Sequence, residues 1–138
     1  MNIRDLEQKA KAGSAAAQCD LGICYLDGID VDVDYNEAFR LLSAAAAQGA
    51  SRAVLNLARM HAKGLGMPVD VQEAIRHYEA VGRVEILAAI ELGRIYSQGL
   101  GVTRDSEKAA NWYRVAATLG DAGSDEIREA LHYSDKTK

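Results

Sequence analysis

The residues that most often carry enzyme chemistry are scarce in this sequence. Its histidines are His61, His77 and His132, and its cysteines are Cys19 and Cys24. No pair of them has the spacing of a His-Glu-x-x-His or Cys-x-x-Cys metal motif. Five residues along one helix also separate the two cysteines by about 7.5 Å, too far for a disulfide. We therefore predict no catalytic residue, no metal site and no cofactor, and reduced thiols that mostly pack in the interior.

An enzyme with a cysteine nucleophile is the main alternative in chemical terms. A catalytic pair of Cys19 or Cys24 with a histidine needs a thiol of low pKa, and nothing in the sequence suggests one. A thiol- or metal-dependent hydrolase is therefore disfavoured. A thiol pKa of about 6 would restore that hypothesis.

Acidic residues concentrate in one stretch of the chain. Between Lys11 and Arg40 there is no basic residue, and there are six acidic ones. Three of them, Asp27, Asp30 and Asp32, form what we call the acidic edge. Such an edge is either a solvated, solubilising surface or a docking edge for a basic partner.

An internal repeat organises the elements that position these residues. A template in the first copy recurs after 36 residues and again after a further 35. The template consists of Ala17, Leu21, Gly22, Tyr25, Gly28, Asp34 and Ala38. Each copy is predicted to form two helices, with a glycine ending the first helix and an aspartate capping the second. Alanine is abundant and proline occurs once, so we expect more than about two-thirds helix and no sheet.

The third copy carries Leu92-Gly93, Tyr96, Gly99-Leu100-Gly101-Val102 and Trp112-Tyr113, and it resembles the Sel1-like repeat, a relative of the tetratricopeptide repeat. The resemblance covers nearly the whole chain. It implies an all-α fold, an α/α solenoid of helix-turn-helix repeats whose first helices line a concave face. It also implies adaptor or scaffold work in protein complexes, of a kind found in bacteria.

The expected organisation is a single repeat domain over residues 1–138 with about eight helices. Half repeats at the two ends supply capping helices. The segments are an N-terminal cap at 1–13, repeats at 14–49, 50–85 and 86–120, a C-terminal cap at 121–133 and a tail at 134–138. One residue is missing between the second and third copies, and Glu85 replaces the usual glycine there. We predict that Gly82 ends its helix early at this joint.

The concave face is the predicted partner-binding surface. Projection by analogy with tetratricopeptide repeats places on it Arg52, Leu55, Arg59, Lys63, Leu87, Ile90, Arg94 and Gln98. Arg59 and Arg94 share one repeat position, so we expect their guanidinium groups to face the same groove. Arginine beside exposed apolar side chains suits an extended acidic or carboxylate-ended segment. The alternative is a solvated face with intramolecular pairs, such as Arg94 with Glu91 or Asp27.

A non-enzymatic protein–protein interaction module is therefore the predicted function. An immunity protein that neutralises a secreted toxin is a special case of it. The net charge of −4 argues against nucleic acid as a partner. The longest uncharged run, residues 41–51, is too short to span a bilayer, so no membrane partner is expected. With no stretch of signal-peptide type, a cytoplasmic location is predicted. The partner's identity and the oligomeric state stay open.

Overall fold

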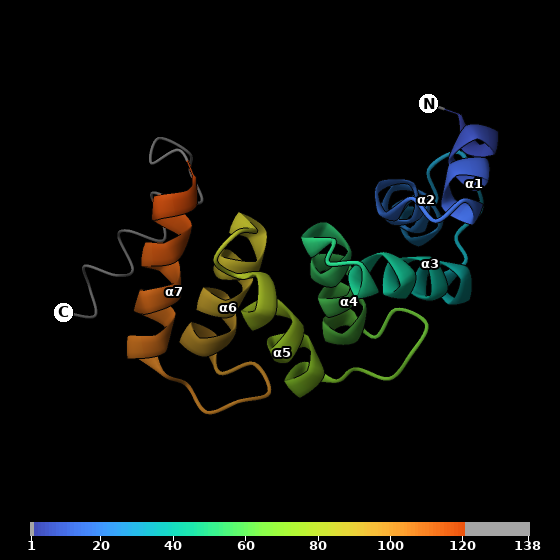
Figure 1. Cartoon of the computed structure of the whole chain (residues 1–138). Helices are drawn as coiled ribbons and strands as arrows, with labels where there is room; N and C mark the ends of the chain where they lie inside the picture. The colour runs from blue at the N-terminus through green and yellow to red at the C-terminus, as the bar shows by residue number, and fades with distance from the viewer. Residues whose placement is uncertain (1, 121–138) are drawn as a thin grey trace. The chain divides into compact units, whose positions relative to one another are not determined.

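The computed structural model describes residues 2–120, and all the regular structure in this range is α-helical (Figure 1). The helices are α1 (Ile3–Lys11), α2 (Ala15–Asp27), α3 (Tyr35–Ala47), α4 (Ser51–Lys63), α5 (Val71–Val81), α6 (Ile86–Gln98) and α7 (Ser106–Leu119). They take up more than two-thirds of the described residues, which contain no strand, as predicted. The predicted C-terminal cap at 121–133 and the tail at 134–138 lie outside the described residues.

The chain separates into two compact units. The N-terminal unit, residues 1–69, carries α1–α4, and the C-terminal unit, from residue 70 onward, carries α5–α7. The boundary falls between the two helices of the second predicted repeat. Each solenoid repeat contacts only its neighbours, so the helices of a repeat chain do not share one hydrophobic core.

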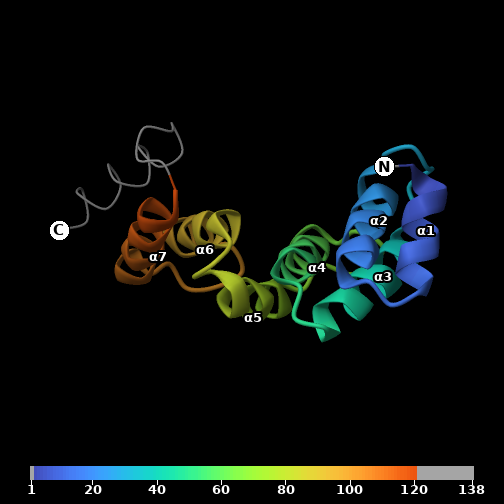
Figure 2. The same cartoon turned by 45° about the horizontal axis from the view of Figure 1, so that its top comes forward.

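The N-terminal unit is built around the packing of α2 against α1, α3 and α4. Helices α1, α2 and α3 lie side by side in both views (Figures 1 and 2). Leu42 and Met60 are fully buried in its core among alanines that let the helices approach closely. Gly22 is the tightest point, because a Cβ there would lie 2.8 Å from Cγ of Leu42. The glycine at this repeat position therefore allows α2 to pack closely against α3.

The C-terminal unit repeats this arrangement with α6 packed against α5 and α7. Leu92 of α6 and Tyr78 of α5 are fully buried. Gly93 occupies the repeat position of Gly22, and a Cβ there would lie 2.5 Å from Cε1 of Tyr113. The same sequence feature thus lets α6 approach α7.

The predicted helix caps are confirmed in all three copies. The side chains of Asp34, Asp70 and Asp105 each accept a hydrogen bond of 3.0 Å from the backbone N–H three residues later. Gly28, Gly64 and Gly99 end the first helices with φ of 69°, 68° and 67°. This left-handed conformation costs glycine little, because it has no Cβ to collide with the backbone.

Asp30 shows how one departure from the repeat pattern is accommodated. It stands where the other two copies have Gly66 and Gly101, whose φ values are 76° and 72°. Asp30 adopts the same left-handed conformation, with φ of 63°. Aspartate tolerates this region better than most L-residues. The first loop therefore keeps the conformation of the others despite its changed sequence.

The predicted irregular joint between the second and third copies is confirmed. Helix α5 ends at Val81, Gly82 is its C-terminal cap, and α6 starts after Glu85. The Glu85 N–H donates to the carbonyl oxygen of Val81 at 2.8 Å, which closes the short connection. Gly82 also provides room for Trp112, because a Cβ at this residue would lie 2.6 Å from Cζ3 of that ring.

Candidate functional site

Two ion pairs connect α2 and α4, the first helices of the first two copies. Arg52 Nη2 lies 2.8 Å from Asp20 Oδ1, and Arg59 Nη2 lies 2.5 Å from Asp27 Oδ1. On both helices the paired residues are seven apart, about two turns, so both pairs fall on the same side of their helices. We call these four residues the ion-pair ladder. It joins Arg59 of the predicted partner-binding surface to Asp27 of the acidic edge, and Arg52 of the same surface to Asp20.

Asn56 completes this ladder, and sequence reasoning missed it. Only 5% of its surface is exposed. Its Nδ2 donates to the carbonyl oxygen of Arg52 at 2.8 Å, and its Oδ1 accepts a hydrogen bond from Arg59 Nη1 at 3.0 Å. The signal that could have found it is the repeat itself, since the equivalent positions hold Asp20 and Glu91. Buried polar groups in folded proteins are hydrogen-bonded, so a polar residue that recurs at one position of the first helices indicates a nearby partner.

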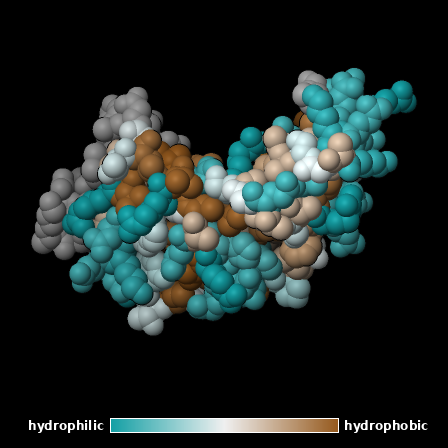
Figure 3. Space-filling model, viewed as in Figure 1, coloured by the Kyte–Doolittle hydropathy of each residue, from teal (hydrophilic) through white to brown (hydrophobic). Residues whose placement is uncertain are grey.

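In the C-terminal unit the corresponding arginine is Arg94 of α6. It forms an ion pair with Glu91, one turn earlier, at the same repeat positions as Arg59 and Asn56. Leu87 and Gln98 are exposed, and Ile90 is half-buried. Leu87 at the start of α6 is 58% exposed, and Leu119 at the end of α7 is 40% exposed. Figure 3 shows hydrophobic surface over this part of the C-terminal unit.

The structure corrects two details of the predicted surface. Leu55, expected to line the groove, is only 9% exposed, because α4 packs against α2 as well as α3 and so covers this side chain. Of the intramolecular pairs named in the alternative, Arg94 with Glu91 is present, whereas Asp27 pairs with Arg59 and not with Arg94. Arg59 and Arg94 belong to different units, and their alignment in one groove stays a prediction. Arg52 and Lys63 are exposed on α4, as expected.

The rest of the acidic edge is solvated. Asp30 and Asp32 are exposed, as are the apolar side chains of Ile29 and Val33 in the same loop. No ion pair joins either aspartate to another of the described residues. The carboxylates of Asp30 and Asp32 therefore face solvent, whereas that of Asp27 is engaged by Arg59.

Cys24 has the electrostatic surroundings of an unreactive thiol. Burial raises its pKa above the usual value of 9.0, and the charges of Asp30, Asp20 and Asp27 raise it further. A raised pKa leaves less thiolate at any given pH, and the thiolate is the nucleophile. The environment of Cys24 is the opposite of what a cysteine hydrolase needs.

Alkylation kinetics test this property of Cys24. In a Cys19→Ala chain at about pH 8, we expect iodoacetamide to react with Cys24 several-fold more slowly than with the same chain unfolded in urea. The rate in the folded chain should still be rising at pH values above about 10, where an ordinary thiol approaches its plateau. A plateau reached below pH 7 would contradict the prediction and restore the thiol-enzyme hypothesis.

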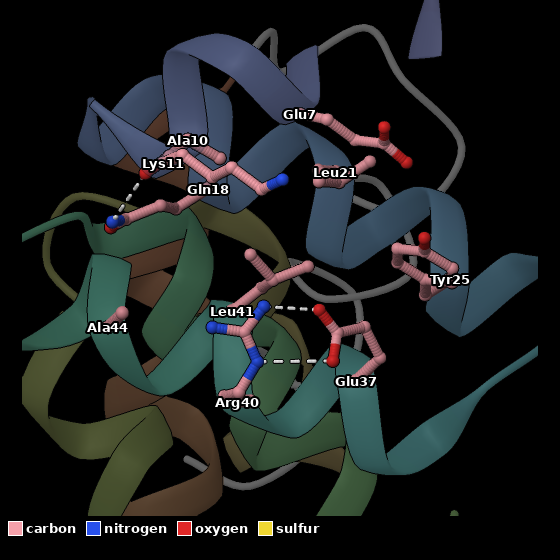
Figure 4. Close-up of a pocket in the computed structure, with 10 residues that line it drawn as sticks. All are labelled: Glu7, Ala10, Lys11, Gln18, Leu21, Tyr25, Glu37, Arg40, Leu41 and Ala44. Carbon is pink, nitrogen blue, oxygen red and sulfur yellow. Dashed lines mark hydrogen bonds and ion pairs between the residues drawn. The ribbon is translucent and has the colours of Figure 1, made fainter. Parts of the chain in front are cut away.

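A pocket of about 220 Å³ lies among α1, α2 and α3 in the N-terminal unit (Figure 4). Its charged lining residues are Glu7, Lys11, Glu37 and Arg40. Arg40 and Glu37 turn toward each other and form a two-bonded ion pair, with Arg40 Nε donating to Glu37 Oε2 at 3.1 Å. Burial, and next the charges of Glu7 and Glu37, raise the pKa of Tyr25 in the wall. The charges of this pocket therefore balance.

The repeat architecture and its caps agree with a known family. The Sel1 repeat model matches residues 15–49, 51–80 and 86–121, and the chain belongs to this family. The chain is similar to the crystal structure of a Sel1 repeat protein from Oxalobacter formigenes, with 25% identity and a TM-score of 0.79. It is also similar to a protective antigen present in uropathogenic Escherichia coli strains, which displays an SLR fold, with 29% identity and a TM-score of 0.80.

These similarities establish the predicted α/α-solenoid fold class. Each covers 99% of this chain, which in turn spans 64% of the Oxalobacter protein and 33% of the Escherichia coli antigen. Sel1 repeats typically form protein-interaction scaffolds rather than catalytic domains. Among residues 2–120, none of the helices combines the length and the hydrophobicity that crossing a bilayer requires.

Proposed function

We propose that this chain is a non-enzymatic interaction module that binds an acidic or carboxylate-ended segment of a partner protein through its first helices. The residues assigned to this first-helix face are Arg52, Arg59, Lys63, Leu87, Ile90, Arg94 and Gln98. Family membership supports the role of scaffold, and the raised pKa of Cys24 argues against thiol chemistry.

The observation that carries this proposal is that Arg59 and Arg94, which share one repeat position, are each oriented by a neighbouring side chain. Arg59 is held by Asn56 and Arg94 by Glu91, in each case by the residue three positions earlier on the same helix. A guanidinium that is already oriented loses less side-chain entropy when a ligand binds. Leu87 supplies exposed apolar surface on α6 that a neighbouring ligand side chain can cover.

The ion-pair ladder leaves donors for such a ligand. A guanidinium has five N–H donors, and the bond to Asp20 occupies one of those on Arg52. The Arg52 side chain is 58% exposed, so a ligand can reach the others. The carboxylates of Asp20 and Asp27 lower the net positive charge, which restricts the site to ligands that also make apolar or backbone contacts.

Binding of the chain to an array of ten-residue peptides tests the proposal, before and after two of its arginines are changed to glutamate. The intact chain should retain acidic peptides in preference to their amide counterparts. The paired change Arg59→Glu and Arg94→Glu should weaken that binding at least tenfold, because two attractive charges become repulsive. The neutral pair Arg59→Gln and Arg94→Gln serves if the reversal harms folding, and should weaken binding to a smaller extent.

Two controls separate this site from general charge effects. Arg76→Glu alters another exposed arginine that also pairs with an acid three residues earlier, but on the second helix α5, and should leave binding unchanged. Asp30→Lys with Asp32→Lys should also have little effect. If the aspartate change removes binding and the arginine change does not, the acidic edge is the docking surface and the proposal is wrong.

A further inference from the structure

A further pocket, of about 280 Å³, lies in the C-terminal unit and is lined by residues of α5, α6 and α7 and by Arg83 of the short joint before α6. Tyr96, Trp112 and Val115 form its apolar wall. The polar residues of its lining carry both signs of charge and one amide: Glu79, Arg83, Lys108 and Asn111. We call this the α5–α7 pocket. Tyr96 and Arg94 are two residues apart, about 200° around α6, so the pocket lies on the opposite side of α6 from the first-helix face.

The two cations of this pocket are positioned by aromatic rings. The Arg83 guanidinium carbon lies 5.8 Å from the centre of the Trp112 ring, and Lys108 Nζ lies 5.1 Å from the centre of the Tyr96 ring. Both distances are within the range of cation–π attraction. Neither cation forms an ion pair with any residue of the described chain. The charge of each is therefore available to a ligand.

Glu79 offsets only one of these two charges. Among the described residues that line the pocket it is the only carboxylate, and its Oε1 accepts a long hydrogen bond of 3.4 Å from the Tyr96 hydroxyl. With Arg83 and Lys108 both charged, the pocket has one net positive charge. Asn111 Oδ1 accepts a hydrogen bond from Arg114, which orients the amide.

The pocket among α1, α2 and α3 provides an internal comparison. It is lined from the same repeat positions, with Glu7, Lys11 and Tyr25 where the α5–α7 pocket has Glu79, Arg83 and Tyr96 (Figure 4). The decisive differences are that Glu37 corresponds to Lys108 and Arg40 to Asn111. Glu37 and Arg40 neutralise each other. Both units thus have a pocket at this place in the repeat, but only the α5–α7 pocket has a net positive charge among its described lining residues.

We propose that the α5–α7 pocket binds a single carboxylate from an acidic side chain of a partner protein, with Arg83 and Lys108 as its charged contacts and Asn111 as an amide donor. An apolar residue next to that acid packs against Trp112 and Val115. A volume of about 280 Å³ is at the lower end for small-molecule sites and suits one or two side chains. One net positive charge matches a carboxylate better than a doubly charged phosphate.

The single tryptophan of the chain lies in this pocket, so its fluorescence reports binding there. The probe is a blocked peptide of alternating glutamate and leucine, compared with its glutamine counterpart. We expect a saturable change in the emission of Trp112 with the glutamate peptide, at a concentration at least tenfold lower than with the glutamine peptide. Equal binding of the two peptides would overturn the proposal, as would displacement of the glutamate peptide by inorganic phosphate at a lower concentration.

The internal comparison supplies a variant that the fold accepts. Lys108→Glu with Asn111→Arg gives the α5–α7 pocket the charges of its N-terminal counterpart, where the same pair is present on α3. This change should weaken peptide binding at least tenfold and leave the helical circular dichroism spectrum intact. Arg83→Gln with Lys108→Gln is the neutral alternative, with the same expectation. Peptide binding that survives in either folded pocket variant would show that the pocket is not the site. As a control, Arg59→Glu with Arg94→Glu should leave this binding unchanged.

Discussion

Replacement of Gly66 by alanine is expected to destabilise the N-terminal unit by about 2–5 kcal/mol. Two costs combine at this residue. Its φ of 76° is left-handed, which an L-residue adopts at a cost of about 1–2 kcal/mol. The added Cβ would also overlap the Cβ of Tyr35, at the start of α3. A Cβ cannot rotate away, so the loop or the start of α3 must shift, and overpacking of this kind costs about 1–3 kcal/mol.

Urea unfolding followed by circular dichroism measures this effect, and Gly49 provides the matched control. Gly49 also has a positive φ, of 88°, but nothing lies within 4 Å of the position a Cβ would take. Gly49→Ala should therefore carry the conformational cost alone, about 1–2 kcal/mol. Equal losses for the two variants would contradict the prediction that contact with Tyr35 sets the larger cost.

Truncation of Leu42 to alanine is expected to remove about 2–5 kcal/mol of stability from the same unit. The Leu42 side chain is fully buried among Ala38, Ala45 and Met60, and the smaller side chain leaves a cavity. Leu87→Ala is the control, because Leu87 is 58% exposed and its truncation should change stability by less than about 0.5 kcal/mol.

A double-mutant cycle with Gly22 identifies the contact responsible. Gly22→Ala alone should be destabilising, because the new Cβ would lie 2.8 Å from Cγ of Leu42. In the Leu42→Ala background that atom is absent, and the added methyl group occupies part of the cavity. We expect Gly22→Ala to become neutral or stabilising there, a coupling of about 0.5–3 kcal/mol. Simple additivity of the two changes would contradict this account of how α2 and α3 pack.

The local elements of the fold were predictable because their causes are local. An aspartate before each second helix and a glycine after each first helix determine where those helices begin and end. Gly82 and the missing residue likewise indicated the short joint before α6. These interactions act within a few residues along the chain, so residue type and spacing are enough to identify them.

The candidate site was less predictable, because it depends on contacts between helices distant in sequence. Arg59 could be placed on an exposed stripe from the repeat register, but its pairing with Asp27, 32 residues away, could not. Leu55 was misplaced because the side of α4 that faces α2 is covered. The role of Asn56 was not predicted, because the hydrogen bond by which it orients Arg59 is seen only in the structure.

The sequence alone determined the helical repeat, its capping residues and the close-packing positions Gly22 and Gly93, since backbone conformation and small-residue spacing follow from residue type. The tertiary structure decided which charged side chains form ion pairs with one another. It joins Arg52 and Arg59 to aspartates of α2, yet leaves Arg83 and Lys108 with aromatic rings in place of carboxylates. Ion pairing acts over a few ångströms in space, and that separation is unrelated to distance along the chain.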